Sequence, residues 1–152
     1  MVDAPLIPEQ DKELSVFLAE VVELAESSLE TEEFLGRISE LGAQFDTLKR
    51  FRKPAVLKDR LKAFARSRLQ LAEELARGGK EVLVLTMVLV HHSPLIVPAL
   101  KETIVLMSGG LRDEESIQVF GKLLKRGRAV AKAAEDEDFL LWINGVIEHL
   151  PE

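Results

Sequence analysis

Histidine is the side chain that most often serves as a general base or metal ligand near neutral pH, and this chain of 152 residues contains three. His91 and His92 are adjacent, so on a regular helix their rings would point about 100° apart and could not comfortably share one ion. His149 lies far away in the sequence, and no His-Glu-x-x-His or Glu-x-x-His pattern is present. The sequence therefore predicts no catalytic residue, no metal ion and no other cofactor. A histidine-based metal protein or hydrolase around His91 and His92 is one alternative.

Other reactive residue types are absent or lack their motifs. The chain has no Cys, which excludes disulfides, thiolate metal sites and a cysteine nucleophile. No Gly-x-Ser-x-Gly elbow occurs. Gly78 and Gly79 precede Lys80, but Glu81 stands where a phosphate-binding loop has Ser or Thr. We interpret this glycine pair, and the pair Gly109–Gly110, as helix ends.

Charge is distributed in blocks, and this is the most distinctive feature of the sequence. The net charge is −6, yet residues 1–48 hold twelve acids and two bases, whereas residues 49–72 hold nine bases and one acid. Residues 121–132 hold five bases and no acid, and residues 133–152 hold six acids and no base. Such blocks favour a protein that works through charged surfaces.

The basic segment, residues 49–72, is the candidate interaction site. On a helix its cations surround the apolar side on three sides, so we expect them to pair with the acidic helices of residues 1–48, within the fold or across a dimer. Arg68 falls inside the apolar side; it can extend to water, pair with a buried acid or reach across an interface, and the first is favoured. The predicted basic patch comprises Lys49, Arg50, Arg52, Lys53, Arg60, Arg66 and Arg68.

Helical periodicity predicts the elements that position these charges. After an extended lead-in over residues 1–8, apolar residues recur at three- and four-residue spacing from Glu9, and Thr31 is the expected N-cap of a second helix. A third helix is expected from Pro54 to the glycines at 78–79. Later helices are expected to begin at Asp113, with a possible break at Gly127, and at the acidic cluster 135–138.

The nine residues Val82–Val90 are apolar except for Thr86, and periodicity cannot distinguish a strand from a buried helix. We predict a helix because the rest of the chain offers no second strand. With residues 95–107 it forms an expected central apolar hairpin, 82–107. The fold class is thus all-α, a single-domain bundle of six or seven helices over residues 1–152. The predicted core comprises Phe17, Leu41, Phe45, Phe64, Leu85, Leu106 and Ile143.

The function that the sequence favours is a non-enzymatic protein–protein interaction or adaptor module, acting through acidic and basic helical faces. Its partners are expected to be another protein and a second copy of itself, since two-fold homodimers are the commonest oligomers. The main alternative is a nucleic-acid-binding accessory subunit that uses residues 49–72 and 121–132, although the acidic net charge opposes it. No secretory signal or stretch long enough to span a membrane is apparent, so a cytoplasmic protein is expected.

Overall fold

The computed structural model describes residues 12–27, 29–69, 75–93, 96–111 and 113–150, with the side chains of 69 and 75–78 left out. These residues form seven helices and the turns between them, which confirms the all-α prediction. The helices are α2 (Lys12–Ala25), α3 (Thr31–Lys49), α4 (Pro54–Leu69), α5 (Leu75–Leu89), α6 (Val97–Gly110), α7 (Glu114–Ala133) and α8 (Glu137–Glu148). The predicted lead-in, 1–8, lies outside the described residues.

The central element is α5, which contacts α2, α3, α4, α6 and α7. Its residues from Val82 to Leu89 are all almost fully buried, and the hydroxyl of Thr86 donates to the carbonyl of Val82 at 2.9 Å. A helix surrounded by other helices has no need of a polar face. The apolar run is therefore a buried helix, as predicted, and it forms a hairpin with α6.

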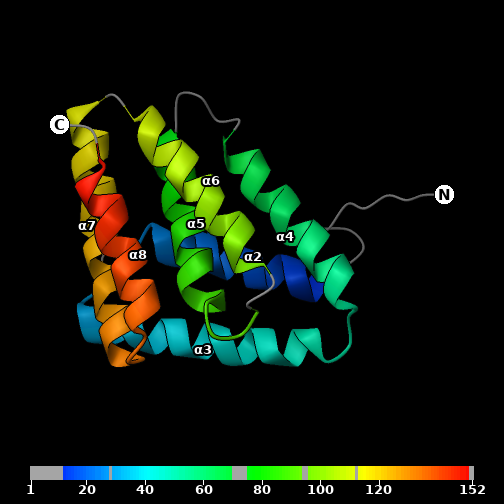
Figure 1. Cartoon of the computed structure of the whole chain (residues 1–152). Helices are drawn as coiled ribbons and strands as arrows, with labels where there is room; N and C mark the ends of the chain where they lie inside the picture. Colours follow the sequence, from blue (N-terminus) through cyan, green and yellow to red (C-terminus); the bar gives the residue numbers. More distant parts are fainter. Residues whose placement is uncertain (1–11, 28, 70–74, 94–95, 112, 151–152) are drawn as a thin grey trace.

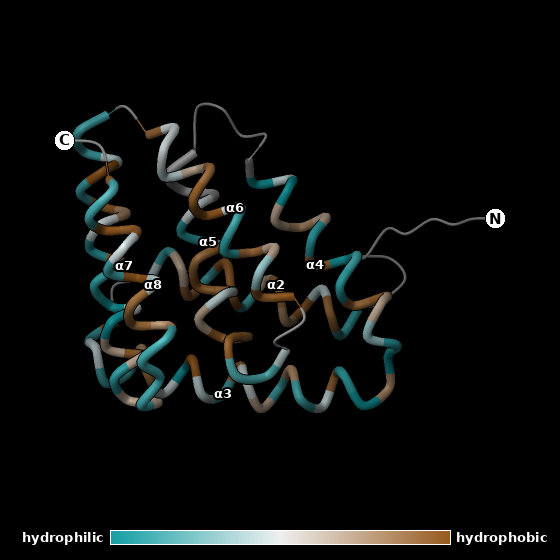
Figure 2. The backbone as a smooth tube through the Cα atoms, viewed as in Figure 1, coloured by the Kyte–Doolittle hydropathy of each residue, from teal (hydrophilic) through white to brown (hydrophobic). Residues whose placement is uncertain are grey.

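Other helices surround α5 in two orientations. In Figure 1, α3 runs across the lower ends of α5, α7 and α8, whereas α4 and α7 lie on opposite sides of the molecule. Hydrophobic residues concentrate where helices face one another, while α3 and α7 alternate between hydrophobic and hydrophilic turn by turn (Figure 2). Six of the seven predicted core residues are buried: Phe17, Leu41, Phe45, Phe64, Leu85 and Ile143.

The prediction for Leu106 is wrong, because this side chain is 65% exposed. Helix α6 packs on α5 and α4 along one side only, so its opposite side, with Leu106 and the half-exposed Val105, faces solvent. An apolar composition all round a helix therefore did not mean burial all round it. None of the described helices has the length and hydropathy needed to cross a membrane.

Two predicted glycine helix breaks are also wrong. Helix α5 begins at Leu75 and continues through Gly78 and Gly79. Met107 occupies the place where a Cβ on Gly79 would lie, which accounts for a glycine at this position. Helix α7 continues through Gly127, which is buried against Ile143 of α8. Both glycines allow close helix packing, a requirement that one helix's own sequence does not display.

The predicted helix starts are mostly correct. Asp113 caps α7 by accepting from the backbone N–H of Ser116 at 3.0 Å. The acidic cluster 135–138 supplies the cap of α8, where Asp136 accepts from the backbone N–H of Phe139 at 2.9 Å. Helix α3 differs by one residue, because its N-cap is Glu30 and Thr31 is already helical.

Candidate functional site

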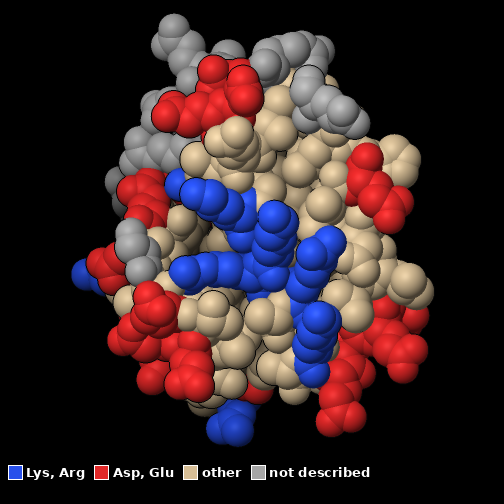
Figure 3. All heavy atoms as spheres, turned by 90° about the vertical axis from the view of Figure 1, so that its left-hand side faces the viewer, with Lys and Arg blue, Asp and Glu red and all other residues tan. Residues whose placement is uncertain are grey.

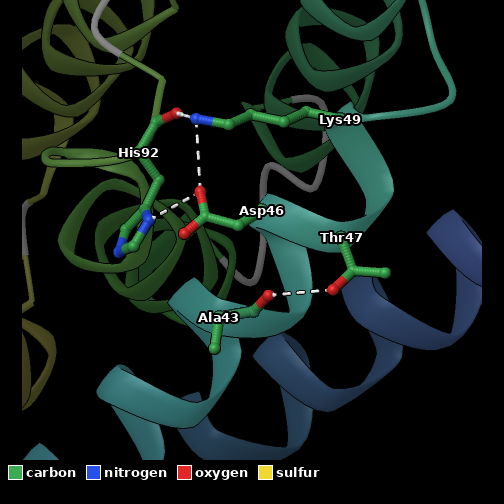
Figure 4. A network of polar contacts seen from close by, with 5 residues as sticks. All are labelled: Ala43, Asp46, Thr47, Lys49 and His92. Atoms are coloured by element: carbon green, nitrogen blue, oxygen red, sulfur yellow. Dashed lines mark hydrogen bonds and ion pairs between the residues drawn. The ribbon is translucent and has the colours of Figure 1, made fainter.

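Three cations of the basic segment are held by carboxylates, and Lys49 is the first. Its Nζ lies 3.2 Å from Asp46 Oδ1 and donates to the backbone carbonyl of His92 at 2.7 Å. Asp46 Oδ1 also lies 3.0 Å from His92 Nδ1 (Figure 4). The end of α3 is thereby joined to the turn that follows α5.

Arg52 is the second cation held by a carboxylate. Its side chain is only 14% exposed, and it pairs with Glu13 Oε1 at 2.9 Å while donating to the carbonyl of Leu48 at 3.0 Å. Glu13 lies in the first turn of α2. This contact joins an acidic helix of residues 1–48 to the basic segment, as the charge blocks led us to expect.

Arg68 is the third, and its environment differs most from that expected. Its guanidinium lies 4.5 Å from the ring centroid of Phe64 and pairs with Glu81 Oε1 at 3.2 Å. Glu81 is a carboxylate at 2% exposure, in the central helix α5. Of the three possibilities considered for Arg68, pairing with a buried acid is observed, while 31% of the side chain also remains exposed to water. The reason is that α5 brings an acid to the apolar side of α4.

The other members of the predicted basic patch are dispersed. Arg50, Lys53 and Arg66 are exposed, and Arg60 is half-exposed and engaged in a further interaction. They lie at the turn after α3 and along α4 rather than on one face, and residues 70–72 are outside the described part of the chain. The seven predicted residues therefore do not form one continuous surface.

A second group of cations is better organised. Lys122, Lys125, Arg126 and Lys132 fall within an arc of about 120° on α7, opposite the buried side of that helix. We call these four residues the α7 stripe. The guanidinium of Arg126 lies 5.1 Å from the ring centroid of Phe34 of α3, and the three lysines are exposed.

Among the described residues, no carboxylate forms an ion pair with any member of the α7 stripe. Figure 3, which looks onto the side of the molecule where α7 lies, shows Lys and Arg side chains gathered in a central group with Asp and Glu around its margin. The fifth cation of residues 121–132, Arg128, points elsewhere and donates from Nε to Asn144 of α8 at 2.7 Å. The stripe is a positive surface on an acidic chain.

The two basic regions do not merge. Helix α4 and helix α7 lie on opposite sides of the molecule, with α5 and α6 between them (Figure 1). A nucleic acid could not contact both without wrapping around the bundle. This arrangement removes the joint surface on which the nucleic-acid alternative depended.

The paired histidines point to different carboxylates. His91 Nε2 lies 2.7 Å from Asp136 Oδ2 at the start of α8, whereas His92 contacts Asp46 of α3. The hydrogen bond with His92 is the main cause that lowers the pKa of Asp46, and Lys49 adds to it. The pKa of Asp136 is lowered chiefly by the backbone N–H of Phe139 and further by His91.

This geometry gives the hydrolase and metal-site alternative little support. No group of three or more His, Asp or Glu side chains in the described part of the chain could hold a metal ion. Ser39 shares a pocket of about 230 Å³ with both imidazoles, but no hydrogen bond joins it to either ring within the described residues. The two His–Asp pairs fasten the turn after α5 to α3 and α8.

Sequence reasoning missed the α7 stripe as a surface and Glu81 as the acid that holds Arg68, and it did not identify which acid of residues 1–48 meets Arg52. The stripe had a readable signal, since residues 122, 125, 126 and 132 share a helical face. Glu81 also had one, because it directly precedes the apolar run of α5. The pairing of Arg52 with Glu13 had none, because it depends on how α2 packs.

Comparison with known proteins yields no match to a protein-family model, a curated protein or a solved structure.

Proposed function

We propose that this protein is a non-enzymatic interaction module whose α7 stripe binds an acidic segment of a partner protein. The observation that carries the proposal is the group of four cations on one side of α7, none with an ion-paired carboxylate among the described residues. Like charges at three- and four-residue spacing destabilise a helix slightly. A helix that keeps such a group without compensation has an electrostatic reason to bind an anion.

The size and surroundings of the α7 stripe favour a short acidic protein segment over nucleic acid. From Lys122 to Lys132 the stripe extends about 15 Å along the helix axis, and Asp and Glu side chains border its face (Figure 3). A double-stranded nucleic acid carries one charge per about 1.7 Å over a much greater length. Its flanking phosphates would meet the acidic margin, whereas a two- or three-turn acidic helix would not.

The expected affinity is modest. Exposed ion pairs contribute about 0.2–1 kcal/mol each, so four of them supply at most a few kcal/mol. Val119, which is 37% exposed and borders the stripe one turn before Lys122, adds an apolar contact. Together these contributions correspond to a dissociation constant of about 0.1–1 mM for an isolated acidic peptide.

The test uses a synthetic helical peptide with Glu on one face and one Leu opposite Val119. We expect the triple variant K122E/K125E/K132E to weaken binding at least about tenfold, because it replaces attraction by repulsion. The matched control is K53E/K58E/R66E, which reverses three exposed cations of the basic segment and gives the same net charge. Calorimetric titration at two salt concentrations should show little change for the control and weaker wild-type binding at high salt.

Two outcomes would count against the proposal. Equal losses in the two triple variants would indicate a general effect of net charge. Submicromolar, steeply salt-dependent binding of single-stranded RNA or duplex DNA, lost in K122E/K125E/K132E, would replace the protein partner by a nucleic acid.

We also propose that the module is a homodimer and acts in the cytoplasm. The exposed apolar side of α6, with Val105 at 50% and Leu106 at 65%, supports the dimer as a surface that a second copy could cover. The absence of Cys is compatible with a reducing compartment. Light scattering should give about twice the chain mass of 17.0 kDa, and Leu106→Glu should return the monomer. A wild-type mass of one chain would reject the dimer.

A further inference from the structure

A pocket of about 420 Å³ opens between the end of α3, the start of α4 and the turn after α5. This volume lies within the range of about 300–1,000 Å³ typical of small-molecule sites. The apolar part of its lining is formed by Phe45, Pro54, Leu57 and Ile96. Phe45, Leu57 and Ile96 are themselves core residues, so this part of the pocket is rigid.

The described residues that form the polar part of the lining are cationic or neutral. They are Lys49, Arg50, Arg52, His92 and Ser93, and no described Asp or Glu lines the pocket. On a chain with a net charge of −6, a pocket lined by three cations and no acid selects for an anion. The pocket therefore combines an apolar wall with a positive wall.

The three cations are not equally available. Lys49 is engaged by Asp46 and by the carbonyl of His92 (Figure 4). Arg52 is engaged by Glu13, whose side chain is 76% exposed. Arg50 is exposed and has no side-chain hydrogen bond or ion pair with any other described residue. Arg52 also takes part in a further interaction, so Arg50 is the cation of this pocket best placed to bind a ligand's negative charge.

We propose that this pocket binds a small molecule with one carboxylate and an apolar body. The carboxylate pairs with Arg50 and competes with Glu13 for Arg52, whose planar guanidinium can bind a carboxylate through two parallel hydrogen bonds. The apolar body lies against Phe45, Leu57 and Ile96. Glu13 then acts as an internal competitor, because its own carboxylate occupies Arg52 when the pocket is empty.

The experiment titrates the whole chain with decanoate below its micelle-forming concentration and follows binding by calorimetry and backbone amide chemical shifts. We expect saturable binding, with shifts concentrated at Ser93, Ile96 and the end of α3. The neutral analogue decan-1-ol should bind at least about tenfold more weakly, and Arg50→Gln should weaken decanoate binding about tenfold, the size expected for one lost charge-assisted contact. Arg66→Gln, an exposed cation of α4 outside this pocket, is the matched control and should have no effect.

Replacing Glu13 gives a second readout, because it should strengthen decanoate binding where Arg50→Gln weakens it. Glu13→Gln should tighten decanoate binding about threefold or more, since it removes the carboxylate that competes for Arg52. Glu23→Gln, which changes an exposed acid near the other end of α2, should leave binding unchanged. The proposal is overturned if decanoate does not bind, if decan-1-ol binds equally well, if Arg50→Gln matches the wild type, or if Glu13→Gln weakens binding. These readouts are independent of the α7 stripe, so K122E/K125E/K132E should bind decanoate as the wild type does.

Discussion

The basic segment and the α7 stripe are both rich in Lys and Arg, but the structure gives their side chains different surroundings. In the basic segment Lys49, Arg52 and Arg68 are held by carboxylates from α3, α2 and α5. In the stripe, no member has an ion pair with another described residue. Arg52 and Arg68 lie against the core, where an uncompensated cation is costly to desolvate, whereas Lys49 and the three lysines of the stripe are exposed and have less need of a partner. The basic segment keeps exposed cations such as Arg50, Lys53 and Arg66, but its members nearest the core, Arg52 and Arg68, are already paired, so less of its charge is available than its composition suggests.

This contrast also shows why charge density alone does not identify an available positive surface. Residues 49–72 have nine bases and residues 121–132 only five. Helix α4 directs Lys58, Lys62 and Arg66 to one side, whereas Arg60 and Arg68 point elsewhere and Arg68 faces the buried Glu81. Helix α7 directs four to a single side. Their direction relative to neighbouring acids, more than their number, decides which region can bind an anion.

The largest effect on stability is expected from truncating a buried side chain of the basic segment. Phe64 is buried and supports the guanidinium of Arg68, so Phe64→Ala should lower the free energy of unfolding by about 3–5 kcal/mol. Phe51→Ala, which removes a ring that is 79% exposed, should change it by less than about 0.5 kcal/mol. Urea unfolding measures both. A loss below about 1 kcal/mol for Phe64→Ala would mean that α4 does not pack on this face.

A smaller effect is expected when the cation itself is removed. Arg68→Ala leaves Glu81 buried without this ion pair, and should destabilise the protein by about 3 kcal/mol. Lys132→Ala in the stripe should stay within about 0.5 kcal/mol of the wild type. Adding Glu81→Leu to Arg68→Met should recover part of the loss, since an apolar pair can replace a buried ionic one. Equal stabilities for Arg68→Ala and Lys132→Ala would contradict the view that ion pairs stabilise the basic segment and not the stripe.

The contacts of Asp46 predict a pH dependence. His92 and Lys49 lower the pKa of Asp46 below its ordinary value of 3.8, so the charged carboxylate stabilises the fold above that pH. The stabilisation is lost as the pH falls through the lowered pKa. Because Asp46 is 41% exposed, its contribution is screened and should be below about 1 kcal/mol. The difference in unfolding free energy between wild type and Asp46→Asn should therefore shrink between pH 6 and about pH 3; a constant difference would contradict this.

The smallest effect has an unusual sign. Lys122→Glu removes a like-charge pair with Arg126 one turn later and creates an attractive one, so it should stabilise the protein by about 0.3–1 kcal/mol. The same change should weaken the binding of an acidic peptide. In the basic segment Arg52→Glu should instead destabilise the protein, because the new carboxylate would face Glu13. Thermal unfolding at low salt separates the two signs; destabilisation by Lys122→Glu would show that the stripe is compensated after all.

Much of the fold was predictable because it depends on local patterns. Periodicity identified most of the helices, although the helix expected from Pro54 to the glycines at 78–79 ends at Leu69 and α5 already begins at Leu75. Asp113 and the cluster 135–138 marked the starts of α7 and α8, and the apolar run 82–90 was recognised as a buried helix. Of the candidate site, only the expectation that acids hold part of the basic segment was confirmed, by Arg52 with Glu13. The glycine breaks and Leu106 were not predictable, because they depend on Met107, Ile143 and the packing of α6.

The sequence by itself determined what acts within a helical turn or two: the helical class, the capping residues, the apolar sides and the blocks of charge. Hydrogen bonds and side-chain spacing over three or four residues suffice for these features. Only the tertiary structure decided which acid meets which base, which glycine admits a neighbouring side chain and which positive side faces water. Those outcomes join residues as far apart as Glu13 and Arg52 or His91 and Asp136. Such pairs arise only once the packing of the whole bundle has brought their helices together.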